Sequence, residues 1–210
     1  MVEQGDPILL PSTSASAAHR RAEALIPTPY GEFRMIVYSD DPEAYAPHIA
    51  LVHPETDPES EVIVRIHSEC ITGDLFGSKR CDCGEQLNRA MRIAAAGKGI
   101  VIYLRQEGRG IGIINKLKAY QLQDKGLDTI EANLHLGFEI DDRHYEVAQG
   151  MLQDLGVSKI QLLTNNPEKV EAFEEGPVTV VRRLPIIIDP VKENKGYLHT
   201  KEFSMGHWLK

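Results

Sequence analysis

The spacing of apolar residues changes near Cys83, and this change limits the fold more than any other feature of the sequence. Before it, residues 31–40 alternate apolar and polar side chains, as a half-buried strand does. Residues 48–53 and 61–68 have the composition of two more strands, and the acidic, proline-containing residues 54–60 between them are typical of a turn. We therefore expect an antiparallel meander in this part of the chain.

After Cys83, helix and strand patterns alternate. Residues 85–99 carry apolar side chains at helical spacing, and Gly97 suits the end of that helix. The same reasoning predicts helices within 114–126, 141–156 and 165–173 and strands at 100–104, 159–164 and 178–188. Asp141 or Asp142 would cap the third helix, and Asn166 the fourth, with Pro167 in its first turn. The pattern predicts an α/β fold (α+β mixed): N-terminal antiparallel strands, then alternating strands and helices around one mixed sheet.

Composition limits the organisation and the partners. The 210 residues suit one domain, and 42% hydrophobic with 26% charged residues is ordinary for a globular chain. We expect a flexible N-terminal arm over residues 1–25 and a folded domain over residues 26–210. No apolar run reaches the ~18–20 residues of a membrane span, and the arm lacks the apolar core of a secretory signal. The net charge of −8 disfavours nucleic acid or membrane partners, so an anionic ligand needs a locally built site.

All three cysteines, Cys70, Cys81 and Cys83, fall within one short segment. Their odd number and close spacing argue against a disulfide framework and favour a reducing, cytoplasmic compartment. Clustered thiolates are the ligands that zinc prefers, and the helix that begins near Gly84 would favour their ionised form. The alternative is that the three are small buried hydrophobic residues. We predict a metal site.

The number of ligands decides what such a metal could do. A structural zinc usually has four protein ligands, whereas a catalytic zinc keeps one position for water. His67 could close the shell, but it and Cys70 would converge only if the strand ends or bulges between them. We favour three thiolates and a water whose pKa falls from ~15.7 towards ~7, which makes it a nucleophile at neutral pH. Nucleobase deaminases attack ring carbons in this way, so a purine-like carbon is a candidate target.

Polar loops follow three of the predicted strands or open predicted helices. The stretch LRQEGRGIG carries Arg105 and Arg109 among glycines that let backbone amides approach a phosphate, although a tight turn explains the glycines equally well. Thr164 and Lys169 flank a second strand end, where simple helix capping is the alternative. In DDRHY, Arg143 could also pair only with a nearby glutamate. Because ligands of α/β sheets collect at the carboxyl ends of strands, we expect these loops to converge with the metal.

Four segments in sequence order closely resemble GTP cyclohydrolase II: residues 65–87, 104–138, 141–145 and 162–170. The resemblance begins at IPTPYGEF and runs to TKEFSMGHWL near the C-terminus, so it implies a GTP cyclohydrolase II-like catalytic domain over residues 26–210. It implies a zinc- and magnesium-dependent enzyme, typically a homodimer, that hydrolyses GTP to 2,5-diamino-6-(5-phosphoribosylamino)pyrimidin-4(3H)-one, formate and pyrophosphate. This reaction is the first committed step of riboflavin biosynthesis. The family often carries a dihydroxybutanone-phosphate synthase domain, for which residues 1–25 are too few, so we expect a stand-alone cyclohydrolase.

The resemblance also implies the site residues. It assigns zinc to Cys70, Cys81 and Cys83 and catalysis to Tyr120, Asp141 and Arg143. The implied GTP contacts are Arg65, Ile66, His67, Ser68, Glu69, Gln86, Glu107, Gly108, Arg109, Thr129, Thr164 and Lys169.

Chemistry suggests roles for several of these residues. Tyr120 would orient the purine or relay a proton, and Glu69, next to a zinc ligand, would support the zinc or carry a proton. Magnesium would bridge the phosphates, with Arg109 and Lys169 offsetting their charge. The family's usual description has the residue matching Arg143 attack the α-phosphorus with Asp141 as base. An arginine with a pKa above ~12 is a poor nucleophile, so we assign Arg143 to stabilising phosphoryl charge.

Three other functions remain open at this stage. A family variant could stop at a formamidopyrimidine nucleotide or after releasing pyrophosphate, although a tyrosine at position 120 favours the full reaction. A non-catalytic, zinc-stabilised nucleotide-binding protein would have no need to keep Tyr120, Asp141 and Arg143 together. A nucleic-acid-binding zinc module is disfavoured by the acidic balance and by the absence of an aromatic and basic stripe.

Overall fold

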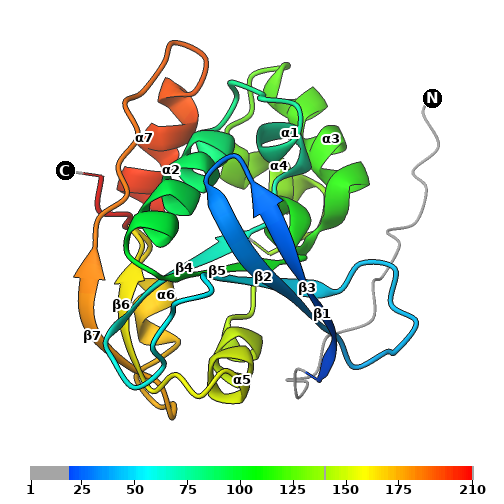
Figure 1. The fold of residues 1–210 in the computed structure, drawn as a ribbon. Helices are drawn as coiled ribbons and strands as arrows, with labels where there is room; N and C mark the ends of the chain where they lie inside the picture. The colour runs from blue at the N-terminus through cyan, green and yellow to red at the C-terminus, as the bar shows by residue number, and fades with distance from the viewer. Residues whose placement is uncertain (1–18, 140, 210) are drawn as a thin grey trace.

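A computed structural model describes residues 19–139 and 141–209, and it shows one seven-stranded mixed sheet with helices on both faces (Figure 1). The order of strands across the sheet is β1-β2-β3-β5-β4-β6-β7. The strands are β1 Arg20–Thr28, β2 Gly31–Tyr38, β3 His48–Val52, β4 Val62–Ser68, β5 Ile100–Leu104, β6 Lys159–Leu163 and β7 Thr179–Leu184. Neighbours from β1 to β5 are antiparallel, and those from β5 to β7 are parallel. The predicted mixed α/β class is confirmed.

The meander expected over residues 31–68 is wrong in its third strand. β5 lies between β3 and β4, and β4 pairs in parallel with both β5 and β6. The reason is burial: apart from Ile63 and Ser68, which are half-buried, every residue of β4 is buried, as central parallel strands are. The boundary at residue 26 also differs, because regular structure begins with β1 at Arg20. The rest of the predicted arm, residues 1–18, lies outside the described residues.

The helices are α1 Ile71–Asp74, α2 Cys83–Ala96, α3 Gly112–Gln123, α4 Thr129–His135, α5 Glu146–Asp154, α6 Glu168–Glu171 and α7 Lys195–Ser204, with a 3₁₀ turn at Glu107–Gly110. The helix ending at Gly97 is confirmed. The caps predicted for the helix over 141–156 are wrong, because that helix starts later and Tyr145 is its N-cap. The cap predicted for the next helix is wrong by one residue, because α6 has Pro167 as its N-cap, although the Asn166 Oδ1 does accept the Glu168 N–H at 3.1 Å. The sequence reasoning missed α1, α4 and α7. No described helix has the length and apolar character to span a membrane.

Two hydrophobic cores hold the helices to the sheet. On one face, α2 packs Ala90, Met91 and Ala94 against Phe33 and Val101. On the other face, α5 packs Ala148, Met151 and Leu152 against the larger cluster from the central strands. Figure 1 shows these layers, with α2 and α7 above the sheet and α5 below it. Covered on both faces, the parallel strands β4, β5 and β6 end at one edge, and their following loops meet there.

Tyr38 links the sheet to α5 and gives a test of the fold. Its buried hydroxyl donates to Asp154 Oδ2 at 2.7 Å, and Arg20 binds the same carboxylate. Tyr38→Phe should cost about 1 kcal/mol, the net worth of one hydrogen bond. The melting temperature should fall by about 2–4 °C for a chain of this size, measured by circular dichroism. Tyr45→Phe is the control, because Tyr45 is fully exposed and its change should shift nothing.

Candidate active site

The three cysteines lie together at the edge where the parallel strands end. Cys70 follows β4, Cys81 precedes α2, and Cys83 is the first residue of α2. Their Sγ atoms all lie within 4.8 Å of one another, and the Cys70 and Cys81 sulfurs are 3.6 Å apart. Three sulfurs this close fit a single thiophilic cation. The predicted cluster is therefore a candidate metal centre.

The protonation of the thiols shows how the cluster is prepared for a cation. Hydrogen bonds from Cys81 and Cys83 lower the pKa of Cys70, and Lys116, whose Nζ lies 3.1 Å from the sulfur, acts in the same direction. The bonds to Cys70 raise the pKa of Cys81 to about 11 and that of Cys83 well above its ordinary value. Cys70 therefore holds the negative charge, and a bound cation would displace the protons of the other two thiols.

Two glycines allow the cysteine segments to approach. A Cβ on Gly84, in the first turn of α2, would lie 2.3 Å from the carbonyl oxygen of Gly73 in α1. A Cβ on Gly73 would lie 3.0 Å from Cys81 Sγ. Any side chain at Gly84 would have to push α1, and with it Cys70, away from the other ligands.

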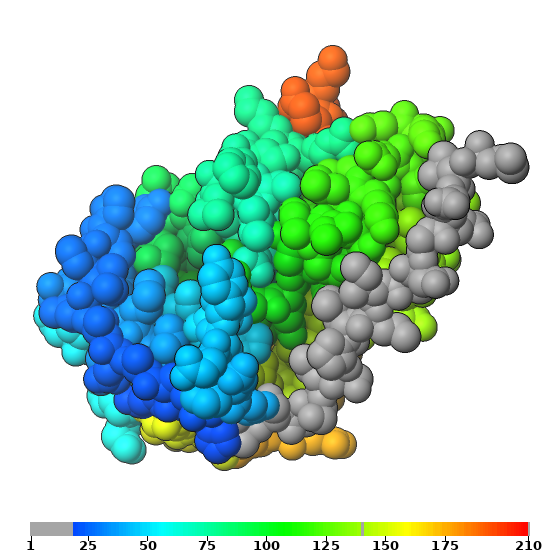
Figure 2. All heavy atoms as spheres, turned by 90° about the vertical axis from the view of Figure 1, so that its right-hand side faces the viewer, coloured from blue at the N-terminus to red at the C-terminus, as the bar shows by residue number. Residues whose placement is uncertain are grey.

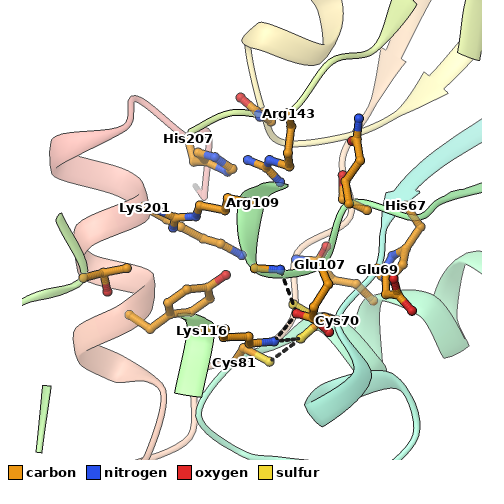
Figure 3. A pocket seen from close by; sticks show the side chains of 18 of the residues that line it. His67, Glu69, Cys70, Cys81, Glu107, Arg109, Lys116, Arg143, Lys201 and His207 are labelled. Atoms are coloured by element: carbon orange, nitrogen blue, oxygen red, sulfur yellow. Dashed lines mark hydrogen bonds and ion pairs between the residues drawn. The ribbon is translucent and has the colours of Figure 1, made fainter. Parts of the chain in front are cut away.

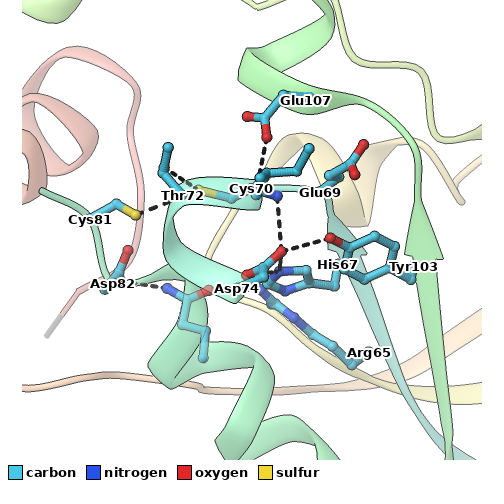
Figure 4. A network of polar contacts seen from close by, with 12 residues as sticks. Arg65, His67, Glu69, Cys70, Thr72, Asp74, Cys81, Asp82, Tyr103 and Glu107 are labelled. Atoms are coloured by element: carbon cyan, nitrogen blue, oxygen red, sulfur yellow. Dashed lines mark hydrogen bonds and ion pairs between the residues drawn. The ribbon is translucent and has the colours of Figure 1, made fainter. Parts of the chain in front are cut away.

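Asp74 fixes the Cys70 turn from below (Figure 4). Its Oδ2 accepts the Cys70 N–H at 2.9 Å and the Tyr103 hydroxyl at 2.9 Å, and its Oδ1 lies 3.1 Å from His67 Nε2. His67 is buried and stacks on Tyr103, and burial lowers its pKa. Because Asp74 engages His67, this histidine lies outside the group of potential metal-binding side chains formed by the three cysteines.

Glu107 holds the same turn from the other side. One of its carboxylate oxygens accepts the Ile71 N–H at 2.6 Å, and the other accepts from Lys116 at 2.7 Å. Lys116 thus bridges Glu107 and Cys70 from α3. It lies four residues before Tyr120, which places both side chains on one face of that helix.

A pocket opens beside the cysteines and brings the predicted site residues together (Figure 3). All of the cysteines, Tyr120, Arg143 and every implied GTP contact except Ile66 line it. Ile66 is fully buried in β4 and meets the site only through its carbonyl oxygen, which accepts from Lys169 at 2.8 Å. Asp141 stands behind Arg143 and binds its Nε at 2.7 Å. Thr129 reaches the pocket from the first turn of α4.

Several lining residues were missed by the sequence reasoning. They are Gln106, Ile111, Lys116, Ala119, Gln123, Asn133, Asn165, Asn166, Tyr197, Lys201, His207 and Leu209. A signal existed for two of them: Lys116 is one helical turn from Tyr120, and Asn133 follows the capping box of Asp128 and Glu131 that announces α4. The residues from Tyr197 onwards carry no comparable pattern.

The pocket is positive although the whole chain carries a net charge of −8. Its lining lysines and arginines are Arg65, Arg109, Lys116, Arg143, Lys169 and Lys201. The lining carboxylates are Glu107, paired with Lys116, and Glu69, whose Oε1 lies 2.8 Å from Arg105. Burial and the cations Lys201 and Arg143 lower the pKa of His207 to about 3. The expectation of a locally built anion site is therefore met by this lining.

Arg109 is held in a costly conformation. Its φ of 63° lies in the left-handed region, which non-glycine residues rarely adopt. The Arg109 carbonyl accepts the Asp142 N–H at 3.1 Å, and a Cβ on Gly110 would lie 2.8 Å from the Asp142 carbonyl oxygen. The turn is thereby packed against the segment that carries Arg143. Both terminal nitrogens of Arg109 are buried without a protein partner, which leaves them for a ligand.

Lys169 is a second cation without an acidic partner. Its side chain is buried, and it donates to the Ile66 carbonyl at 2.8 Å. Burial, with Arg65 and Arg143 nearby, lowers the pKa of Lys169 well below its ordinary value. An anion in the pocket would restore the charged form.

The fold and the site define a class: an α/β protein in which a candidate three-thiol metal centre adjoins a pocket lined by lysines and arginines. The sequence profile described as GTP cyclohydrolase II matches residues 19–185, and the chain belongs to that family. The resemblance found in the sequence is confirmed.

Curated relatives agree with this assignment. GTP cyclohydrolase-2 of Haemophilus influenzae (strain PittGG) is 49% identical over 90% of this chain and 88% of its own length. GTP cyclohydrolase-2 of Actinobacillus succinogenes is 47% identical over 90% of this chain and 88% of its own. Riboflavin biosynthesis protein RibBA of Chlorobium phaeovibrioides is 51% identical, and this chain spans only 46% of it. A crystal structure of RibBX from A. baumannii has a TM-score of 0.46 and 20% identity over 85% of this chain and 42% of that chain, too distant to inform function.

The contact between Gly84 and Gly73 predicts a loss of metal affinity. Gly84→Ala should weaken zinc binding about tenfold or more, because α1 must move and carry Cys70 with it. Changes to residues that support metal ligands typically have effects of this size. Competition with a chromogenic chelator measures this affinity. Gly196→Ala is the matched control, since a Cβ there meets nothing within 4 Å. Equal affinity in both variants would contradict the proposed constraint.

The unpaired charge of Lys169 predicts opposite effects on stability and on anion binding. Lys169→Met removes a buried amine that has to give up its proton when the ligand-free protein folds, so the ligand-free protein should gain about 1 kcal/mol, or about 2–4 °C in melting temperature. The rise in melting temperature on adding pyrophosphate should shrink at the same time. Lys159→Met, at the exposed start of β6, is the control for both measurements. A lower melting temperature together with an unchanged pyrophosphate effect would refute this account.

Proposed function

We propose that this protein hydrolyses GTP to 2,5-diamino-6-(5-phosphoribosylamino)pyrimidin-4(3H)-one, formate and pyrophosphate, in a zinc- and magnesium-dependent reaction that is the first committed step of riboflavin biosynthesis. One observation carries the proposal. The three-cysteine cluster and a set of buried, unpartnered cationic donors face the same pocket. A substrate with a ring carbon to be hydrolysed and a phosphate chain to be held requires both features in one place.

The metal and the phosphate groups take different parts of the pocket. Figure 3 shows Cys70, Cys81 and Lys116 on one side and Arg109, Arg143, Lys201 and His207 on the other. Zinc held by the three cysteines would supply a Lewis acid that activates water at neutral pH. The guanine C8 would therefore face the cysteines and the triphosphate would face the arginines.

Tyr120 and Glu69 flank the cysteine end of the pocket. Burial raises the pKa of the Tyr120 phenol, so Tyr120 stays protonated and can donate to the purine or to the opening ring. Burial also raises the pKa of Glu69, which the ion pair with Arg105 opposes. A carboxyl group with a raised pKa beside Cys70 suits the transfer of a proton to the product nitrogen as its bond to the formyl carbon breaks.

Arg143 is suited to charge stabilisation and not to nucleophilic attack. Burial disfavours its charge, but Tyr145 and the bidentate partner Asp141 more than offset this and raise its pKa. Asp141 in turn keeps a lowered pKa, because the hydrogen bonds from Arg143 outweigh its burial. A permanently charged guanidinium would bind the phosphoryl oxygens as pyrophosphate departs, and Asp141 would hold it in place.

Magnesium is assigned to the substrate. The two carboxylates that line the pocket are already paired with cations, Glu107 with Lys116 and Glu69 with Arg105, and Asp141 behind it is paired with Arg143. Phosphate oxygens are therefore its proposed ligands, and Lys169 and Arg109 would offset the remaining charge.

We further propose a cytoplasmic homodimer, as the family resemblance implies. Large apolar side chains are exposed on and beside α1, α3 and α4: Leu75, Phe76, Ile114, Leu117 and Leu134. These elements form the teal and green part of the surface in Figure 2. Burying such a surface against a second copy would remove it from water.

The decisive experiment incubates zinc-loaded protein with GTP and magnesium and quantifies formate and pyrophosphate together. Equal amounts of the two products are expected. Cys81→Ser should lose formate release by about 10³-fold or more, because water activation at the metal is lost. Its pyrophosphate release should fall much less, because the arginine end of the pocket is untouched.

The other outcomes separate the alternatives. Pyrophosphate without formate in the parent protein would indicate a truncated reaction. A product that keeps the formyl group as a formamide would then be found at a higher mass than the fully hydrolysed product. GTP binding without either product would indicate a nucleotide-binding protein. Equal loss of both activities in Cys81→Ser would mean that the metal only supports the fold.

A further inference from the structure

The C-terminal helix α7 supplies a wall of the pocket although it lies outside the residues that match the family profile, 19–185. Tyr197 and Lys201 from α7, with His207 and Leu209 after it, line the pocket. Figure 3 shows Lys201 and His207 beside Arg109 and Arg143. A long connection without regular structure separates α7 from β7, which ends at Leu184, so contacts outside the sheet must hold α7 against the pocket.

An ion pair ties α7 to the cysteine loop. Lys201 Nζ lies 2.9 Å from Asp82 Oδ1, and the two side chains are 11% and 2% exposed. Asp82 lies between Cys81 and Cys83 and also accepts from Gln86, so it is fixed to the first turn of α2. Buried charge pairs are costly to break on one side only, because the remaining charge is left without a partner. The pair therefore acts as a latch between the last helix and the metal centre.

The latch also places aromatic and cationic groups around the anion site. The Tyr197 ring centroid lies 4.4 Å from Lys201 Nζ and 6.0 Å from the guanidinium carbon of Arg109. Because Arg109 has no hydrogen-bond partner for its terminal nitrogens, the Tyr197 ring is one of the groups that orient it. Displacing α7 would release Arg109 as well as open the pocket to water.

A second contact closes the chain end onto the site. The Trp208 backbone N–H donates to the Asn165 carbonyl at 2.9 Å, and the guanidinium of Arg183 lies 4.9 Å from the Trp208 ring centroid. Asn165 lies in the loop after β6, next to Thr164. The C-terminal segment therefore spans the pocket from the cysteine segment before α2 to the loop after β6.

We propose that Lys201 is a positioning residue for the reaction: its ion pair with Asp82 holds α7 as a wall of the substrate pocket and orients Arg109 through Tyr197. The inference rests on the proposed function, since it concerns how the triphosphate of GTP is retained. Contacts that hold the remote phosphates equally in the ground and transition states act on KM more than on kcat.

Trp208 is the single tryptophan of the chain and reports the position of the segment. Lys201→Met should raise the quenching of its fluorescence by acrylamide at least about twofold, because the end of the chain detaches from the site. Acrylamide is neutral, so the lost charge does not bias the measurement. KM for GTP should rise about tenfold while kcat changes less than about threefold, with zinc still bound at one per chain.

Two variants make this result specific. Lys201→Arg can keep the ion pair with Asp82. Its acrylamide quenching of Trp208 and its KM for GTP should both lie close to those of the parent protein. Lys195→Met removes a lysine from the exposed start of the same helix and should change neither.

Each outcome decides the proposal. A raised KM with normal quenching would mean that Lys201 binds substrate directly and is no latch. Raised quenching with unchanged KM and kcat would mean that α7 is no part of the substrate site. If the parent protein released neither product from GTP, the proposed function would fail, and with it the substrate role of α7. The quenching data would still report whether Lys201 holds the segment.

Discussion

The site depends on the close backbone contact between Gly73 in α1 and Gly84 in α2. Cys70 comes from one segment and Cys81 and Cys83 from another, yet their sulfurs lie within 4.8 Å of one another, close enough to hold a single cation. Two helix backbones can meet this closely only where neither carries a side chain at the contact. Asp74 and Glu107 then fix the Cys70 turn from opposite sides, so the ligand atoms are in place before a metal arrives.

The pocket is lined by positive side chains although the chain as a whole is negatively charged. Acidic residues dominate the sequence, but the ends of the parallel strands gather lysines and arginines into one pocket. Arg109 and Lys169 are left without acidic partners there, and Arg109 also keeps an unfavourable backbone angle. Such groups lower the stability of the free protein. They suit the binding of a polyanion, because no carboxylate has to be displaced from them first.

Local patterns could predict much of this structure. The helical spacing from Leu87 to Ala95 and the apolar run at residues 100–104 identify α2 and β5 directly. The family motifs placed the three cysteines and most of the implied GTP contacts in the pocket, but twelve other lining residues were missed. The neighbours of β4 could not be predicted, since strand order depends on burial of the whole sheet and not on any one segment. Asp141 was wrongly predicted to cap a helix. Its side chain binds Arg143 instead, and no helical or strand spacing in the sequence indicates that contact. Lys201 escaped notice because its partner Asp82 lies far away along the chain.

The strand order also constrains how the chain can be made. β4 pairs with β5 and β6, both of which are synthesised after it, and has no contact with β3 in the sheet. While the ribosome has delivered only the first ~100 residues, β4 has neither of its neighbours, and the turn that carries Cys70 has no strand to rest on. Lys116 and Glu107, which complete that turn, also come later. In a nascent chain the three thiols are therefore not yet held together, and the candidate metal-binding geometry forms only when the centre of the sheet closes.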